Sequence, residues 1–227
     1  MRLIIILLAL VLFAAPAQAD AWAVPPQTYA PATIARCAQA SAAKLQPNEA
    51  RYEICADQMT LFTAALSQAR AENRLLIVDF GATWCPWCRS LQGQLQSPAL
   101  FGTTGGRVEL AAAFQVLEIG LSTLHAGRRI DVPSGHAVLG EVLAAAKGAK
   151  LRSVPFLAVI DPNDATKTVV RNLDDFEQAG AGTHDAALVR AFLAEAHDHI
   201  RQGATAPTEP GWLRKKFTRM WQRAFGD

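Results

Sequence analysis

Short, nearly continuous apolar runs alternate along the chain with segments of helical periodicity. The run LLIVDF at 75–80 is typical of a strand that is buried on both faces of a sheet. Two further runs, at 114–119 and 154–160, predict strands of the same kind. The turn residues Asp-Pro-Asn-Asp at 161–164 follow the third run, so a fourth strand at 168–171 is expected to pair back across the turn.

Segments between these runs carry apolar residues at every third or fourth position. This spacing predicts helices at 57–73, 89–95, 136–147 and 185–200. After the first helix, the order is strand, helix, strand, helix, hairpin and helix, which is typical of an α/β domain. About half of the residues are hydrophobic and the formal net charge is +2. The chain can therefore bury a core, and its charge argues against a general nucleic-acid binder.

The residues before this domain differ in composition. Residues 20–33 are rich in proline and alanine, and the stretches at 34–45 and 49–55 predict two short helices. We therefore expect a helical N-terminal extension at 20–57 and a main domain at 58–202.

The first 19 residues have the layout of a secretory signal peptide. Arg2 is followed by an apolar run at 3–15 and by Ala-Gln-Ala at 17–19, a typical cleavage site. The run is shorter than the roughly 20 residues that a transmembrane helix needs. We expect an exported protein in the periplasm, and an uncleaved anchor is the alternative.

The segment Cys-Pro-Trp-Cys at 85–88 is the strongest chemical signal. The pattern places Cys85 in the first turn of a helix, where unpaired N–H groups and the helix dipole favour the thiolate. Cys88, one turn later, can resolve a mixed disulfide that Cys85 forms. Asp79 is a lone carboxylate in the preceding strand and is expected to accept the proton of Cys88. A helix cap or an ion pair is its alternative role.

No metal site is expected at this pair. A zinc site needs three or four protein ligands, and one C-x-x-C supplies two. The chain has no second C-x-x-C, and its five histidines lack a finger-like spacing. We expect these histidines to be solvated surface residues. A metallochaperone that uses both thiols is a further alternative.

Two stretches resemble the thioredoxin family. DFGATWCPWCR at 79–89 is similar to its active-site segment, and SVPFLAVID at 153–161 is similar to its later strand, which opens with a cis-proline. The resemblance covers about residues 58–200 and implies a thioredoxin fold, with a central mixed β-sheet flanked by helices, and thiol–disulfide exchange. It also implies that Pro155 is cis and faces the cysteines, and that Val154 offers its backbone to an extended substrate.

The surroundings of the pair also depart from the thioredoxin pattern. Pro-Trp replaces thioredoxin's Gly-Pro, and Gly81 stands where thioredoxins often have a large aromatic residue. The stretch at 120–152 is longer than its thioredoxin equivalent. Trp84 and Trp87 are assigned to the substrate-binding surface. Packing is the alternative, and it is favoured more for Trp84.

The other two cysteines, Cys37 and Cys55, lie in the predicted extension. In an oxidising compartment, we expect them to form a structural disulfide. A second redox couple that exchanges with the C-x-x-C is the alternative.

The C-terminal residues form a separate segment. Residues 203–210 read as a linker, and 211–225 predict a basic amphipathic helix. Such a helix either lies on a membrane surface or a partner protein, or packs on its own domain.

Together these patterns predict an exported thiol–disulfide oxidoreductase that reduces or exchanges protein disulfides. Its partners would be disulfide-containing proteins and a separate electron donor or acceptor protein, and no bound cofactor is implied. The alternative is a thioredoxin-fold binding or assembly module whose 85–88 bond stays closed.

Overall fold

The computed structural model describes residues 50–203, with gaps at 98–99, 101–109, 126, 148 and 179–180. The predicted signal peptide, Cys37, the linker at 203–210 beyond its first residue, and the basic helix at 211–225 lie outside the described residues. Within the described ranges, no helix is long and apolar enough to cross a membrane.

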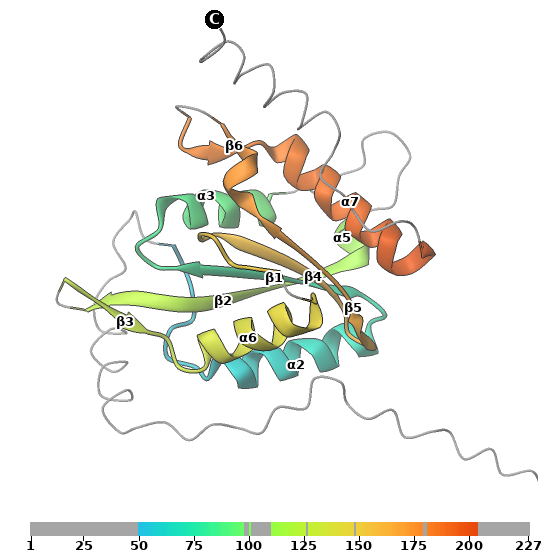
Figure 1. The fold of residues 1–227 in the computed structure, drawn as a ribbon, viewed down its shortest axis with the longest axis horizontal. Helices are drawn as coiled ribbons and strands as arrows, with labels where there is room; N and C mark the ends of the chain where they lie inside the picture. The colour runs from blue at the N-terminus through green and yellow to red at the C-terminus, as the bar shows by residue number, and fades with distance from the viewer. Residues whose placement is uncertain are drawn as a thin grey trace, which may run out of the picture.

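A five-stranded sheet with the order β3-β2-β1-β4-β5 forms the centre of the domain (Figure 1). The strands are β1 (Leu75–Ala82), β2 (Phe114–His125), β3 (Arg128–Asp131), β4 (Phe156–Asp161) and β5 (Asp164–Asn172). β1 and β2 are parallel and the other neighbouring pairs are antiparallel, so the sheet is mixed. The two-residue strands β6 (Glu177–Gln178) and β7 (Thr183–His184) pair separately.

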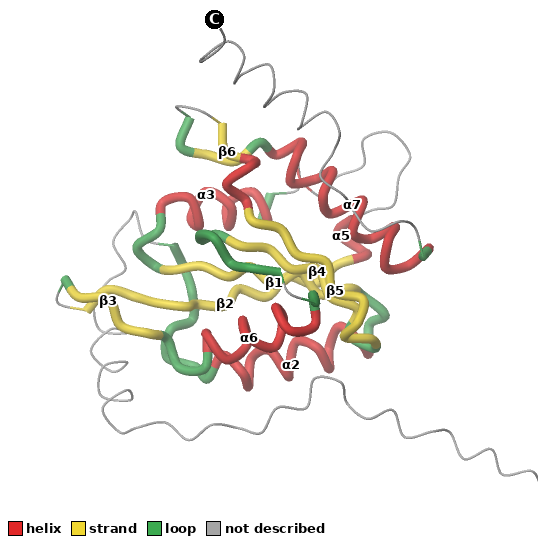
Figure 2. The backbone as a smooth tube through the Cα atoms, viewed as in Figure 1, coloured by secondary structure: helices red, strands yellow, loops and turns green. Residues whose placement is uncertain are grey.

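Helices cover both faces of the central sheet, as Figure 2 also shows. α2 (Gln58–Ala71) and α6 (Gly135–Ala145) pack on one face, and α3 (Pro86–Leu95) and α7 (Ala186–Gln202) pack on the other. The short helix α5 (Leu110–Ala113) precedes β2, and the 3-10 turn η1 (Leu173–Phe176) follows β5. This order confirms the predicted α/β class.

Strand β1 is buried along its whole length. Its side chains alternate between the two faces, as the pleat of a strand requires. Val78 and Phe80 pack with α2 and α6, whereas Leu75 and Ile77 pack with α3 and α7. Asp79 follows the second set by alternation, so its carboxylate is directed into the layer that holds α3.

The strands and helices predicted within residues 57–200 are found, with differences at several ends. α3 begins at Pro86 and β5 at Asp164, both earlier than predicted. β1 continues past Gly81 to Ala82, and β2 continues to His125, where it turns back into β3. The hairpin between β2 and β3 was not predicted from the sequence, because β3 is four residues long and mostly exposed and carries no apolar run. Gly127 in the turn has a φ of 74°, a left-handed conformation that glycine adopts readily.

The predicted helix at 49–55 is wrong over the residues that the structure describes. Residues 50–56, here called the N-terminal strap, contain no helix. Ala50 and Tyr52 are buried and their neighbours Arg51 and Glu53 are exposed, which is the alternation of an extended chain. The strap stays extended because its backbone bonds to other elements, described below, rather than to itself. Tertiary contacts thus override the helix propensity of this stretch.

Candidate active site

Cys85 and Cys88 form a disulfide at the beginning of α3. Their Cα atoms are 5.3 Å apart, and the two residues are 3% and 0% exposed. Cys85 is the N-cap residue, and its Sγ accepts a hydrogen bond of 3.1 Å from the backbone N–H of Cys88. Pro86 takes the first helical position, where a missing N–H costs no hydrogen bond. Once reduced, Cys85 would carry its negative charge at the positive end of the helix dipole.

A cis peptide bond between Val154 and Pro155 lies opposite the disulfide. The Sγ of Cys85 is 3.7 Å from the carbonyl oxygen of Val154. The cis conformation predicted for Pro155 is therefore confirmed, and Val154 lies beside the first cysteine. A backbone segment at this place borders the sulfur that an incoming disulfide would approach.

Asp79 lies in β1 and is 0% exposed. The hydroxyl of Tyr52 donates a hydrogen bond of 2.9 Å to its Oδ2, while its Oδ1 has no hydrogen-bond partner among the described residues. Burial raises the pKa of Asp79 to about 8, and the charge of Glu118 adds to this, whereas the hydrogen bond from Tyr52 lowers that pKa. Asp79 is thus bonded to a phenol. Among the described residues it neither caps a helix nor takes part in an ion pair.

Tyr52 occupies a slot made by two glycines. Gly81 and Gly120 are directly opposite each other in the parallel pair of β1 and β2. A Cβ atom at Gly81 would lie 2.0 Å from the Tyr52 oxygen and 3.0 Å from the Cys88 sulfur, and one at Gly120 would lie 3.2 Å from the Tyr52 Cβ. Any larger residue at 81 would therefore collide with the phenol. Gly81 has no ring of its own, and the Tyr52 ring fills the space beside it.

The strap that carries Tyr52 is bonded to the elements around the disulfide. Gln92 of α3, only 4% exposed, accepts from the N–H of Arg51 at 2.8 Å and donates to its carbonyl oxygen at 3.1 Å. The N–H of Ala50 donates to the carbonyl oxygen of Thr83 at 2.9 Å. These bonds hold the strap on the N-terminal side of Tyr52.

Gln58 fastens the other end of the strap. Its amide Nε2 donates to the carbonyl oxygen of Glu53 at 2.6 Å, and its Oε1 accepts from the N–H of Gly120 at 3.0 Å. This buried amide therefore connects the strap to β2 at the glycine that lines the Tyr52 slot. The sequence patterns did not identify Tyr52. The local sign of it was Gly81, a residue without a side chain in a strand that carries mostly large apolar side chains.

The two tryptophans have different surroundings. The indole N–H of Trp84 donates to the Ser122 hydroxyl at 3.1 Å, and the guanidinium of Arg129 lies 3.7 Å from the centre of its ring. Trp84 is therefore packed against the β2–β3 hairpin. Trp87 is partly exposed and its ring meets His184 edge to face, with 5.4 Å between the ring centres.

His184 corrects the expectation that the histidines are surface residues. It is 1% exposed, and both of its ring nitrogens lack hydrogen-bond partners among the described residues. Burial lowers the pKa of His184 to about 4, against a smaller opposing effect of Asp174. The ring is thus neutral at neutral pH and packs beside Trp87.

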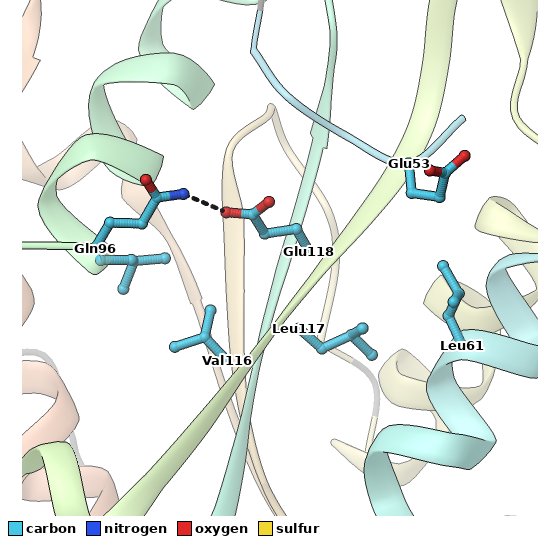
Figure 3. A pocket seen from close by; sticks show the side chains of 7 residues that line it. Glu53, Leu61, Gln96, Val116, Leu117 and Glu118 are labelled. Carbon is cyan, nitrogen blue, oxygen red and sulfur yellow. Dashed lines mark hydrogen bonds between the residues drawn. The ribbon is translucent and has the colours of Figure 1, made fainter. Parts of the chain in front are cut away.

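A pocket of about 370 Å³ lies beside the strap, between α2, α3 and β2 (Figure 3). Its lining consists of Glu53, Leu61, Leu95, Gln96, Val116, Leu117 and Glu118. Glu118 is the register neighbour of Asp79 and accepts a hydrogen bond of 3.5 Å from the Gln96 amide. Burial raises its pKa above the ordinary value. Glu118, the residue opposite Asp79 in β2, therefore lines this pocket.

The remaining sequence predictions concern metals and the second cysteine pair. Within the described residues, no group of three or more His, Cys, Asp or Glu side chains is placed to hold a metal ion. Cys55 is exposed at the end of the strap. Its expected partner, Cys37, lies outside the described residues, so the 37–55 disulfide stays a prediction.

The chain was compared with known proteins. No family model and no curated protein matches it. A similar solved structure is the crystal structure of a disulphide isomerase from Xylella fastidiosa Temecula1, with 19% identity and a TM-score of 0.36, covering 74% of this chain and 95% of that chain. The strand order, the helices on both faces and the cysteine pair opposite a cis-proline are themselves the features of a thioredoxin-like α/β fold.

Proposed function

We propose that this chain is an exported thiol–disulfide oxidoreductase that reduces or exchanges protein disulfides. The observation that carries the proposal is the place of Cys85. Its sulfur caps α3 and borders the Val154 carbonyl, so the helix stabilises a thiolate where a substrate backbone can lie alongside.

The first step uses reduced Cys85. Its thiolate attacks one sulfur of a substrate disulfide, the substrate S–S bond breaks, and the released substrate thiolate takes up a proton. In the second step, Cys88 loses its proton and attacks the Cys85 sulfur. The mixed disulfide then breaks, the second substrate sulfur leaves with the electron pair, and the 85–88 bond closes.

Two electrons thus pass from the cysteine pair to the substrate. A separate donor protein must reduce the pair again, and in the reverse direction an acceptor protein must oxidise it. Trp87 and the Val154–Pro155 backbone are proposed to contact the substrate, since all three lie around Cys85 or in the segment that follows it. Trp84 supports this surface through the hairpin.

Cysteine variants test the proposal. Cys85→Ser is expected to abolish the reduction of insulin disulfides, and Cys88→Ala is expected to trap mixed disulfides with a substrate. Cys55→Ser is the matched control, a similar change outside the C-x-x-C, and should retain the activity of the pair. Full activity of the Cys85→Ser protein would overturn the proposal.

A redox titration of the 85–88 pair separates catalysis from a closed structural bond. Catalytic pairs titrate between roughly −270 and −120 mV, and a potential below about −300 mV indicates a bond that resists reduction. The second result would favour the binding or assembly module over the oxidoreductase.

A further inference from the structure

We propose that Tyr52, supplied by the N-terminal strap, carries the proton between Cys88 and Asp79 when the mixed disulfide is resolved. This role rests on the proposed oxidoreductase function and adds to it a residue that lies outside the C-x-x-C segment and its strand.

Three reactive groups meet at one place in the structure. The Tyr52 hydroxyl donates to Asp79 at 2.9 Å, and the empty position of a Gly81 Cβ adjoins both that hydroxyl and the Cys88 sulfur, at 2.0 and 3.0 Å. Within the described part of the chain, no hydrogen bond joins Cys88 directly to Asp79. The phenol therefore borders the same small space as the sulfur and is hydrogen-bonded to the carboxylate, which is the order that a proton carrier between the two groups requires.

The groups around Asp79 favour such a transfer. The strap contributes Tyr52, β2 contributes Glu118 and α3 contributes Cys88, while the neighbour in β4 is the uncharged Leu157. Burial raises the pKa of Asp79 to about 8, so this carboxylate can take up a proton near neutral pH.

Tyr52 itself is poorly suited to keep a negative charge. Burial and then the charge of Asp79 raise its pKa well above 10.0. The phenol should therefore accept one proton while it gives up another and remain neutral throughout. A proton carrier of this kind needs a hydroxyl on a ring that is held in place. The glycine slot and the bond from Arg51 to Gln92 hold the Tyr52 ring.

The Cys88 thiol gives its proton to the Tyr52 oxygen, and the Tyr52 O–H proton moves to Asp79. The Cys88 thiolate attacks the Cys85 sulfur, and the bond from Cys85 to the substrate breaks. The substrate thiolate leaves with that electron pair, the 85–88 disulfide forms, and Asp79 ends as a neutral carboxylic acid.

Tyr52→Phe keeps the ring and removes only the hydroxyl. The probe is a labelled peptide dimer joined by one disulfide, and the reaction is quenched with acid and alkylated to count mixed disulfides. Formation of the mixed disulfide is measured in Cys88→Ala, with and without Tyr52→Phe, and should not change by more than about twofold. Release of the second peptide from Cys85 should slow about 100-fold in Tyr52→Phe, a typical loss for removed acid–base catalysis.

Arg51→Ala is the matched control on the strap, because its exposed side chain changes while its backbone bonds to Gln92 remain. It should release the peptide at the wild-type rate. Release at the wild-type rate in Tyr52→Phe would overturn the proton-carrying role, as would equal slowing of both steps. If Cys88→Ala formed no mixed disulfide, the proposed function itself would fail.

The pH profile separates proton transfer from simple packing. Release should speed up with pH as Asp79 ionises, with a midpoint near its pKa of about 8. The midpoint should move to higher pH in Tyr52→Phe, because the hydrogen bond that lowers the pKa of Asp79 is lost. Because this shift follows from the lost hydrogen bond alone, the rate well above the midpoint decides. It should stay slow in Tyr52→Phe if the hydroxyl carries the proton, and recovery to the wild-type rate there would contradict the proposal.

Gly81→Ala tests the same role through the slot. Its new Cβ would collide with the Tyr52 hydroxyl and would also lie 3.0 Å from the Cys88 sulfur, so this variant disturbs the slot as a whole while Asp79 and both cysteines are still present. We expect slow release here as well, and a normal rate with the phenol displaced would contradict the role. Gly93→Ala in α3 is the control, since nothing lies within 4 Å of its added Cβ. Should Gly81→Ala fail to fold, the Tyr52→Phe result decides.

Discussion

Two buried ionisable side chains lie near the C-P-W-C segment, Asp79 bonded to the Tyr52 hydroxyl and His184 beside Trp87. Burial is the main cause of both pKa shifts and acts in opposite directions, to about 8 for Asp79 and to about 4 for His184. Both groups are therefore mostly neutral near pH 7. They differ in their partners, because Asp79 accepts a hydrogen bond from Tyr52 and His184 has none among the described residues.

This difference separates a group that can exchange protons from one that fills space. Asp79 has a hydroxyl that leads toward a sulfur atom, so its neutral and charged forms can both take part in chemistry. The ring of His184 meets the edge of another ring, and only its backbone is held, by the Gln94 amide at 2.7 Å. Burial alone thus does not identify a catalytic group, and the polar partner is the better indicator.

The largest expected effect tests the Asp79 side. A raised pKa means that the folded protein holds a proton that the unfolded chain loses, so stability falls as pH rises from about 4 to about 8. Asp79→Asn mimics the protonated form. It should raise the free energy of unfolding by roughly 4 kcal/mol at pH 7, at about 1.4 kcal/mol per pKa unit.

Urea unfolding of the oxidised proteins at pH 4 and pH 7 measures this gain. The difference between variant and wild type should be small at pH 4, close to the ordinary carboxyl pKa, because the unfolded chain then keeps much of this proton as well. Asp131→Asn, at a side chain that is 80% exposed, is the matched control and should change little at either pH. A gain of equal size at both pH values would show that Asp79 is not the titrating group.

The second largest effect concerns His184, for which stability changes with pH in the opposite direction. Because its folded pKa is lowered to about 4, stability is full above about pH 6.5 and is lost as pH falls toward 4. Through this group, the wild type should lose roughly 3 kcal/mol over that range. His184→Leu removes the loss, so its curve should be flatter by about 1.4 kcal/mol per pH unit.

Between pH 4 and 6.5 the two groups oppose each other, so the slope is best measured in an Asp79→Asn background. The lost contact with Trp87 would shift the whole His184→Leu curve, and only the slope bears on the titration. An unchanged slope would mean that His184 is protonated in the folded protein, and the contrast with Asp79 would no longer hold.

Local sequence patterns were sufficient for the central part of the site. The apolar run places Asp79 in a buried strand, and the C-x-x-C beside it begins a helix as predicted. The cis bond at Pro155 followed from a resemblance, since most X–Pro bonds are trans. These features depend on neighbours along the chain or on a familiar motif, which is why they were predictable.

The parts that were missed depend on contacts between distant segments. Tyr52 and Asp79 are 27 residues apart, and the strap was predicted as a helix because the bonds that α3 and β2 make with it cannot be read from its own residues. His184 stands outside any periodic run, so only its packing against Trp87 shows that it is buried. The role of such single residues can be assigned only when the fold shows which distant segments surround them.

The smallest expected effect extends the comparison to the second tryptophan. Arg129 covers the ring of Trp84, so the β2–β3 hairpin is held on that side of the pair by a cation–π contact. Arg129→Ala should cost about 0.5–1 kcal/mol, because the ring is partly exposed. It should also raise the fluorescence quenching of Trp84 by iodide in a background where the other four tryptophans, Trp22, Trp87, Trp212 and Trp221, are replaced by Phe. Arg128→Ala, at an exposed neighbour, is the control, and equal quenching in both variants would show that Arg129 does not shield the ring.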